Sequence, residues 1–199
     1  ERLLEQKSSI EKKFNIDTLV YVTDITDEEQ VKSTSEKIFK ECGKIDGLVN
    51  NAANNPKVEE GRTDFSRLEN FSLEIWEKDI SVGLTGSFLC SKYFGPLIAK
   101  NKEGGSIVNI SSDLGLIAPD QKLYRKDNLE DHKQPVKPVT YSVVKSGLIG
   151  LTRYLSTYWI EEGVRCNAIC PGGIKNDQSK EFLEEVSKRV PMKRLANSD

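Results

Sequence analysis

The chain has 199 residues, which is enough for one α/β domain with a sizeable core. Its 29 basic and 31 acidic residues give a net charge of -2, so it lacks the basic surface that nucleic acid or an anionic membrane attracts. No apolar run approaches the roughly 20 residues of a membrane span, and no signal peptide is visible. These observations favour a globular protein without a nucleic-acid or membrane partner.

The cysteine and histidine content argues against a structural metal site. The cysteines form no CxxC pair, and the one histidine, His132, has no cysteine or histidine partner nearby in the sequence. We therefore expect no metal site. We also expect buried free thiols in a reducing cytoplasm, at Cys42, Cys90, Cys166 and Cys170.

Helical and strand patterns alternate along the chain. Residues 1–14 resemble the middle of a helix, and the β-branched run Ile16–Thr23 predicts a strand. The capping box Thr26–Glu29 predicts the start of a second helix, which Gly43 is suited to end. Further strands are predicted at 45–50, 106–111 and 164–170, and further helices at about 72–100, 140–160 and 180–190.

Strands separated by helices of this length imply parallel βαβ units. The strands are continuously apolar, which fits a sheet that is covered on both faces. The predicted fold class is therefore α/β, with a doubly wound parallel sheet.

Polar residues gather at the predicted strand ends, at 24–27, 50–53, 111–112 and 171–174. Turns commonly use such residues, so any one of these positions has an ordinary explanation. Four of them at one edge favour a ligand site, because ligands of such sheets bind outside the carboxyl ends of the strands.

Tyr141 and Lys145 carry the catalytic signal. Their i, i+4 spacing on a predicted helix puts both side chains on one face. A nearby ammonium favours the phenolate form of a tyrosine, which can then exchange a proton with a substrate oxygen. A hydroxyl from Ser112 could hold the same oxygen. Such pairs also arise by chance on helix surfaces, but no other tyrosine of this chain has a lysine four residues later.

Together these motifs resemble the short-chain dehydrogenase/reductase family, whose members are Rossmann-fold oxidoreductases. DGLVNNAA is similar to the family's NNAG motif, SIVNISS to its serine strand, TYSVVKSG to its Tyr–Lys helix and CPGGI to its nicotinamide loop. The matches follow the family order along nearly the whole chain.

The resemblance implies hydride transfer between the nicotinamide of NAD or NADP and a carbonyl or alcohol. Tyr141 would be the acid/base, Ser112 would hold the reacting oxygen, and Lys145 would tune Tyr141 and bond the ribose. The implied cofactor-binding residues are Asp24, Ile25, Asn51, Ala52, Tyr141, Lys145, Pro171, Gly172 and Ile174. Because the family's long helices commonly pair between subunits, a homodimer or homotetramer through 72–100 and 140–160 is also implied.

The family's glycine-rich phosphate loop has no counterpart in this sequence. We interpret 1–199 as a single Rossmann-type domain that lacks the first two strands and the last helix and strand. The strand at 16–23 is then expected to lack a neighbour, and the chain is expected to hold a dinucleotide weakly. The choice between NAD and NADP stays open, because it is read at the second strand.

Gly83 stands where the family often has an asparagine that holds a proton-relay water. The Gly83 carbonyl, a water or Ser81 could take over this function. A glycine inside a helix costs about 1 kcal/mol, so we expect a backbone or packing reason for it.

An insertion at about 117–139 separates Ser112 from Tyr141 by 29 positions. Long loops are either functional or merely mobile, so it is either a solvated loop or a recognition element for a large polar substrate through Tyr124 and Arg125. With VKPVTYSVVK, it resembles dehydrogenases linked to flagellin glycan and nonulosonate modification, which implies an activated sugar. The alternative to an enzyme is a non-catalytic relative that binds a nucleotide or a partner.

Overall fold

The computed structural model describes residues 2–54, 64–127, 129–176 and 178–198. Three parallel strands form its sheet in the order β1-β2-β3, namely β1 (Gly47–Asn50), β2 (Gly105–Ile110) and β3 (Val164–Ile169). In register, Val49 pairs with Val108 and Ile107 pairs with Cys166. The last three predicted strands and their parallel arrangement are therefore confirmed.

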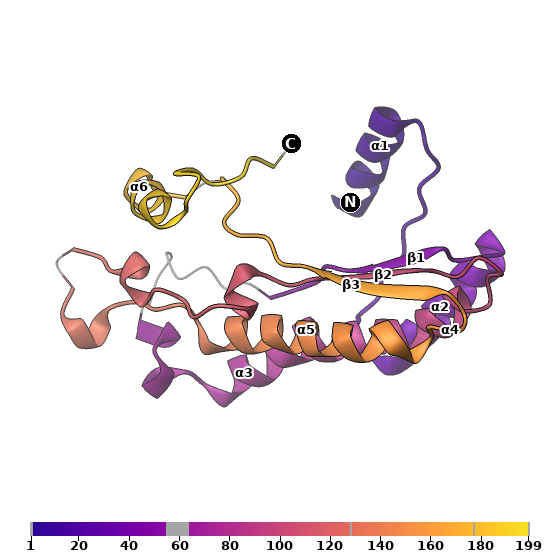
Figure 1. Ribbon diagram of the computed structural model, residues 1–199, viewed down its shortest axis with the longest axis horizontal. Coiled ribbons are helices and arrows are strands. Elements are labelled where there is room, and N and C mark those ends of the chain that lie inside the picture. The colour runs from indigo at the N-terminus through magenta and orange to yellow at the C-terminus, as the bar shows by residue number, and fades with distance from the viewer. Residues whose placement is uncertain (1, 55–63, 128, 177, 199) are drawn as a thin grey trace.

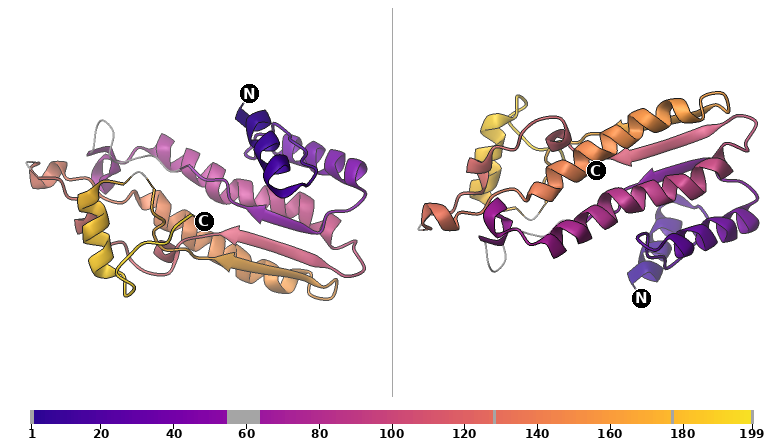
Figure 2. Two further views of the ribbon diagram at one scale, coloured as in Figure 1. Left: turned by 90° about the horizontal axis from the view of Figure 1, so that it is seen from above. Right: turned by 90° about the horizontal axis from the view of Figure 1, so that it is seen from below.

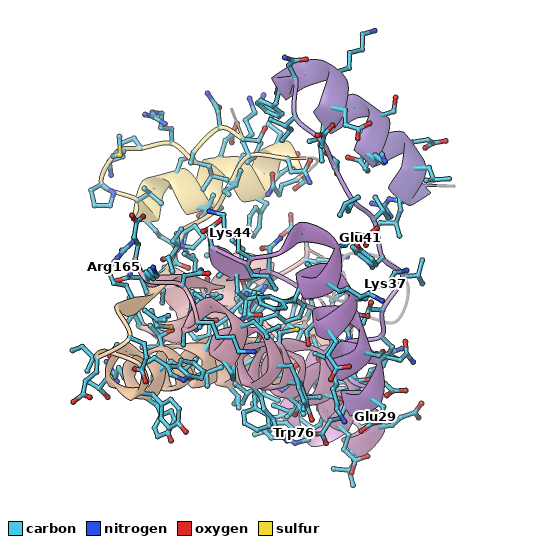
Figure 3. The ribbon with its side chains drawn as sticks, turned by 90° about the vertical axis from the view of Figure 1, so that its right-hand side faces the viewer. Glu29, Lys37, Glu41, Lys44, Trp76 and Arg165 are labelled. Carbon is cyan, nitrogen blue, oxygen red and sulfur yellow. The ribbon has the colours of Figure 1, made fainter. Side chains whose placement is uncertain are left out.

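Six α-helices accompany the sheet in the described part of the chain. They are α1 (Arg2–Phe14), α2 (Glu28–Cys42), α3 (Leu73–Ile80), α4 (Gly86–Ile98), α5 (Val139–Tyr158) and α6 (Lys180–Arg189). Short 3-10 turns are η1 (Asp64–Ser66), η2 (Leu68–Asn70), η4 (Asp113–Gly115), η5 (Gln121–Tyr124) and η6 (Asp131–Lys133). Figures 1 and 3 show α2, α3, α4 and α5 on one side of the sheet, with α1 and α6 on the other.

The helix predicted at 72–100 is continuous but contains a π-helical turn. This turn, η3 (Ser81–Thr85), joins α3 to α4, and it includes Gly83. Ser72 caps the start of α3 by accepting a hydrogen bond from the Ile75 N–H at 3.2 Å. Figure 2 shows the α3–α4 path running beside α5 beneath the sheet. Local π turns are frequent at functional sites, and this one contacts α5.

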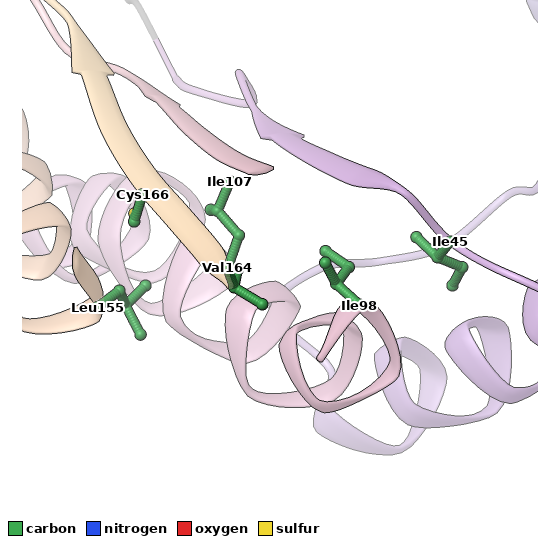
Figure 4. Close-up of a cluster of buried hydrophobic side chains, with 6 residues drawn as sticks. All are labelled: Ile45, Ile98, Ile107, Leu155, Val164 and Cys166. Carbon is green, nitrogen blue, oxygen red and sulfur yellow. The ribbon is translucent and has the colours of Figure 1, made fainter. Parts of the chain in front are cut away.

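The hydrophobic core lies between the sheet and the helices α4 and α5 (Figure 4). Its buried members are Ile45, Ile98, Ile107, Leu155, Val164 and Cys166. Trp159 packs against this cluster, and Gly95 leaves room for its ring, since a Cβ at Gly95 would lie 2.2 Å from Cη2 of Trp159. Burial of each such aliphatic side chain contributes about 1.5–3 kcal/mol, which fixes α4 and α5 against the strands.

The doubly wound fold class is confirmed, but in the described chain the face of the sheet toward α1 and α6 is covered only loosely. Side chains alternate between faces along a strand, so the neighbours of the buried Cys166 and Asn50 point away from α4 and α5. Val49 is 63% exposed and Ile169 is 53% exposed on that opposite face. Among the described elements, no helix packs closely enough there to bury them.

The strand predicted at Ile16–Thr23 does not form. The segment runs beside α2, where the Tyr21 hydroxyl donates to Glu41 and Thr23 Oγ1 lies 2.9 Å from Thr34 Oγ1. No described strand lies alongside to supply the ladder hydrogen bonds that a strand requires. This outcome agrees with the expectation that the segment lacks a neighbouring strand.

Helix α2 begins one residue later than its capping box predicts. Asp27 is the N-cap, and its Oδ1 accepts a hydrogen bond from the Gln30 N–H at 3.1 Å. Thr26 instead donates its N–H and its hydroxyl to Oδ1 of Asp24, because a carboxylate two residues earlier is in reach of both groups. Gly43 ends the helix as predicted, with φ 76°.

Candidate active site

Parallel pairing brings the carboxyl ends of β1, β2 and β3 to one edge of the sheet. The segments that follow the strands meet there, since the Asp113 N–H donates to the Pro171 carbonyl at 3.1 Å. Beneath this edge, the buried Asn50 donates to Asn109 at 2.8 Å, and Asn109 donates to Thr152 of α5 at 2.8 Å. The predicted ligand edge therefore has a rigid polar support.

Two adjacent serines after β2 have different surroundings. Ser111 donates its hydroxyl to the Lys145 carbonyl at 2.7 Å and so ties α5 to the sheet. Ser112 is also buried, and its hydroxyl donates to Oδ1 of Asp113 at 2.8 Å and accepts from the Leu114 N–H at 3.2 Å. Ser111 is thus committed to structure, whereas Ser112 has a polarised hydroxyl beside an acid.

Tyr141 and Lys145 lie one turn apart near the start of α5, as their spacing predicts. The Lys145 ammonium donates to the Ile110 carbonyl at the end of β2, at 2.7 Å, and lies 5.8 Å from the centre of the Tyr141 ring. Burial lowers the pKa of Lys145 from its usual value. The predicted catalytic serine, tyrosine and lysine therefore lie around the carboxyl end of β2.

A second lysine lies closer to the tyrosine ring, and sequence reasoning missed it. The ammonium of Lys137 is 3.6 Å from the centre of the Tyr141 ring. Burial lowers the pKa of Lys137 to about 8, Asp113 opposes this shift, and Lys145 adds to it. The signal was present in the sequence, since Lys137 stands four residues before Tyr141 just as Lys145 stands four residues after it.

A buried acid, Asp79, also lies at the site and was missed. Its side chain is 6% exposed, and Oδ2 accepts a hydrogen bond from the Thr140 hydroxyl at 2.5 Å. Together with Tyr141 and Lys145 it lines a hollow of about 10 Å³, which is room for about one water molecule. A carboxyl group, a phenol and an amine therefore line one small space.

Gly83 lines the same hollow, and close helix packing explains it. A Cβ at Gly83 would lie 2.6 Å from Cγ1 of Val144, so a side chain there would force η3 away from α5. The expected packing reason is confirmed. The Gly83 carbonyl accepts from the Ser87 hydroxyl at 2.9 Å, and Ser81 is not among the residues that line the hollow.

The predicted cofactor residues differ in how firmly their neighbours hold them. Asn51, Ala52, Gly172 and Ile174 are exposed. Hydrogen bonds from the N–H and the hydroxyl of Thr26 lower the pKa of Asp24, and Ile25 packs against Gly86 of α4. Gly172 lies beside Asp113, because its added Cβ would be 3.4 Å from Asp113 Oδ2.

These residues fit the nicotinamide end of a dinucleotide better than its phosphates. Lys145 provides a partly desolvated ammonium beside Tyr141, and backbone without bulky side chains follows β3 at Gly172 and Gly173. The sequence contains no glycine-rich loop for the pyrophosphate. The resemblance implies that Asn51 and Ala52 lie on the adenosine side of such a site.

The insertion is folded against α6 and does not simply extend into solvent. Buried Gln134 donates to the carbonyls of Lys126 and Leu129, at 3.0 and 2.6 Å. Tyr124 has its ring centre 6.0 Å from that of Phe182, and Arg189 pairs with Asp120 at 2.6 Å. Tyr124 and Arg125 line a hollow of about 280 Å³ between η5 and α6, where Arg125 also pairs with Asp131.

Two further findings concern membranes and metals. Within the described ranges, no helix combines the length and the apolar character needed to cross a membrane. The same part of the chain contains no cluster of three or more histidine, cysteine or acidic side chains placed to hold a metal.

All four cysteines are free, but the prediction that they are buried holds only for Cys166, since Cys42 is exposed and Cys90 and Cys170 are partly exposed.

Comparisons with known proteins agree with this geometry. Residues 1–124 match the family model described as short chain dehydrogenase, and residues 131–199 match the one described as Enoyl-(Acyl carrier protein) reductase. An uncharacterized oxidoreductase of Thermotoga maritima is 32% identical over 183 residues, covering 87% of this chain and 62% of that protein. Post-translational flagellin modification protein A of Campylobacter coli is 27% identical, covering 97% of this chain and 71% of that protein.

Among solved structures, ElxO with NADP bound matches with a TM-score of 0.75 at 28% identity, over 99% of this chain and 74% of that one. NAD+-bound xylitol dehydrogenase matches with a TM-score of 0.80 at 22% identity, over 98% of this chain and 73% of that one, which shows the same fold. The chain spans between about half and two thirds of the length of the first three curated relatives. Because the short chain dehydrogenase model matches more than half of this chain, the chain belongs to the short-chain dehydrogenase family.

Proposed function

We propose that this chain carries the catalytic centre of an NAD- or NADP-dependent oxidoreductase that interconverts a carbonyl and an alcohol. The observation that supports it is the grouping of Ser112, Tyr141 and Lys145 around the carboxyl end of β2. The bound nicotinamide supplies the acceptor or donor of the hydride. Chain 1–199 forms one domain in this proposal, with the 117–139 insertion at its rim.

The residues of the chain then handle the oxygen and its proton. In alcohol oxidation, Tyr141 takes the proton of the substrate hydroxyl, while the carbon that bears this hydroxyl gives up a hydride to the nicotinamide. In carbonyl reduction, Tyr141 returns the proton to the oxygen. To hold the reacting oxygen, the Ser112 hydroxyl turns away from Oδ1 of Asp113, to which it donates in the structure, and donates to the substrate instead. Lys145 places a positive charge beside Tyr141 and bonds the ribose.

Asp79 is our candidate for the proton relay that the family often assigns to an asparagine at the position of Gly83. Asp79 lines the hollow of about 10 Å³ together with Tyr141 and Lys145, whereas Ser81 does not line it. A carboxylate there can accept the proton that leaves Tyr141 through one intervening water.

For the substrate class we propose a polar molecule such as an activated sugar. The folded insertion supports this, since Tyr124 and Arg125 line a hollow of about 280 Å³. The test is cofactor oxidation and reduction by the extended protein, meaning the chain with flanking sequence at both ends, over a panel of ketones, aldehydes and nucleotide-activated sugars. Cofactor binding without turnover of any panel member would favour the alternative of a non-catalytic binding protein.

We also propose a homodimer or homotetramer in the cytoplasm. An apolar groove between α4 and α5 of about 280 Å³ is lined by Phe88, Leu151 and Tyr154, among others, and Tyr154 is 62% exposed. Light scattering of the extended protein should give at least twice the monomer mass. Tyr154→Asp should shift it toward monomer, whereas Leu68→Asp, at a position 72% exposed outside this groove, should not. A monomer at all concentrations would contradict this proposal.

A further inference from the structure

Lys137 carries a positive charge that its described surroundings balance only in part. Its side chain is partly buried, and its ammonium lies 3.6 Å from the centre of the Tyr141 ring. Among the described residues, none accepts a hydrogen bond from this ammonium and none forms an ion pair with it. The aromatic face replaces only part of the hydration that the ammonium has lost.

The charged groups that face Lys137 do not offset its positive charge fully, so an anion bound there would be stabilised. They are Asp113 from η4 and Lys145 from α5, with the Tyr141 phenol between the two lysines. Asp113 is already engaged, because one of its oxygens accepts hydrogen bonds from the Ser112 hydroxyl and from the Leu114 N–H. Burial and the charge of Lys145 disfavour the ammonium, so the pKa of Lys137 is lowered to about 8.

The backbone holds Lys137 in this place. Its N–H donates to Oε1 of Gln121 at 2.8 Å, and the next residue, Pro138, is the buried N-cap of α5. The preceding Val136 N–H donates to the Ser66 hydroxyl at 3.0 Å. Anchoring on both sides means that the ammonium is prepositioned beside the phenol before any ligand arrives.

We propose that Lys137 binds an oxyanion, a carboxylate or a phosphate, that the substrate carries close to the carbonyl or alcohol handled by Tyr141. The identification of this anion as part of the substrate rests on the proposed function. The anion site itself does not, and it can be measured without cofactor or turnover. The substrate class that follows is an anionic carbonyl compound or its alcohol.

The test is NMR of the extended protein carrying lysines labelled at Cε, titrated with acetate and with inorganic phosphate. The Lys137 signal, identified by its loss in Lys137→Gln, should move to saturation with at least one probe. Acetate stays ionised over the range used, so its binding should be about tenfold weaker at pH 9 than at pH 7, because the charged fraction of a group with a pKa about 8 falls by that factor. Stronger binding of acetate would indicate a substrate carboxylate, and stronger binding of phosphate would indicate a substrate phosphate.

Matched variants decide what the signal means. Lys137→Arg should keep the anion site, and so should Lys133→Gln, which removes an exposed lysine of the same segment that pairs with Glu130. Tyr141→Phe keeps the aromatic ring, so it should keep anion binding even if turnover is lost, which separates this inference from the proposed function. Absence of saturable binding, or equal binding to Lys137→Gln, would overturn the proposal.

Discussion

Replacing Tyr141 by phenylalanine is expected to lower the turnover of the extended protein by about 10²- to 10⁴-fold, the usual contribution of a positioned acid/base. The variant keeps the ring that contacts Lys137 and removes only the oxygen that exchanges the proton. Cofactor affinity should stay nearly unchanged, because Lys145 and the loop after β3 are untouched. Steady-state kinetics and cofactor titration of the two proteins provide the measurement.

Tyr154→Phe is the matched control for this variant. Tyr154 lies on the same helix, is 62% exposed and faces the groove between α4 and α5. Its turnover should equal that of the unmodified protein. Turnover retained in Tyr141→Phe would remove Tyr141 from the mechanism and, with it, the assignment of the acid/base.

Replacing Gly104 by alanine should lower the free energy of unfolding by about 3 kcal/mol. Gly104 has φ 67°, where a side chain costs about 1–2 kcal/mol. In addition, the new Cβ would lie 2.1 Å from the Gly163 carbonyl oxygen, a backbone atom that cannot turn away, and such overpacking costs typically 1–3 kcal/mol. Denaturant unfolding monitored by circular dichroism measures the loss.

Gly43→Ala separates the two contributions. Gly43 also has a left-handed backbone, with φ 76°, but nothing lies within 4 Å of its added Cβ. Its loss should therefore be only about 1 kcal/mol. Equal losses in the two variants would show that the contact between the backbones of Gly104 and Gly163, where β2 and β3 begin, does not constrain the fold.

The elements with strong local signals could be predicted from the sequence. The predicted strands at 45–50, 106–111 and 164–170 form β1, β2 and β3. Apolar runs that alternate with helices are stable as parallel βαβ units, in which the helices cover the sheet. Tyr141 and Lys145 share a helix face for a purely local reason, their spacing. Ser112 could be chosen over Ser111 only through the resemblance, and the hydrogen bond from Ser111 to the Lys145 carbonyl now gives the physical reason.

The features that depend on distant parts of the chain could not be predicted in this way. Ile16–Thr23 has the composition of a strand, but a strand also needs a partner, and none lies beside it. Asp79 meets Thr140 only because α3 packs on α5, which in turn requires Gly83. Lys137 reaches the Tyr141 ring because the insertion returns to the start of α5.

The measurement that most directly tests the dehydrogenase assignment is a thermal-shift titration of the 199-residue chain and of the extended protein with NAD(H) and NADP(H). Ligand at 100 times its dissociation constant stabilises a protein by about 2.7 kcal/mol, which is readily seen as a rise in Tm. We expect the extended protein to gain stability with one cofactor pair, and the chain alone to gain little because its sequence has no phosphate loop. If neither protein responds to any of the four nucleotides, the site at the end of β2 does not serve a nicotinamide cofactor.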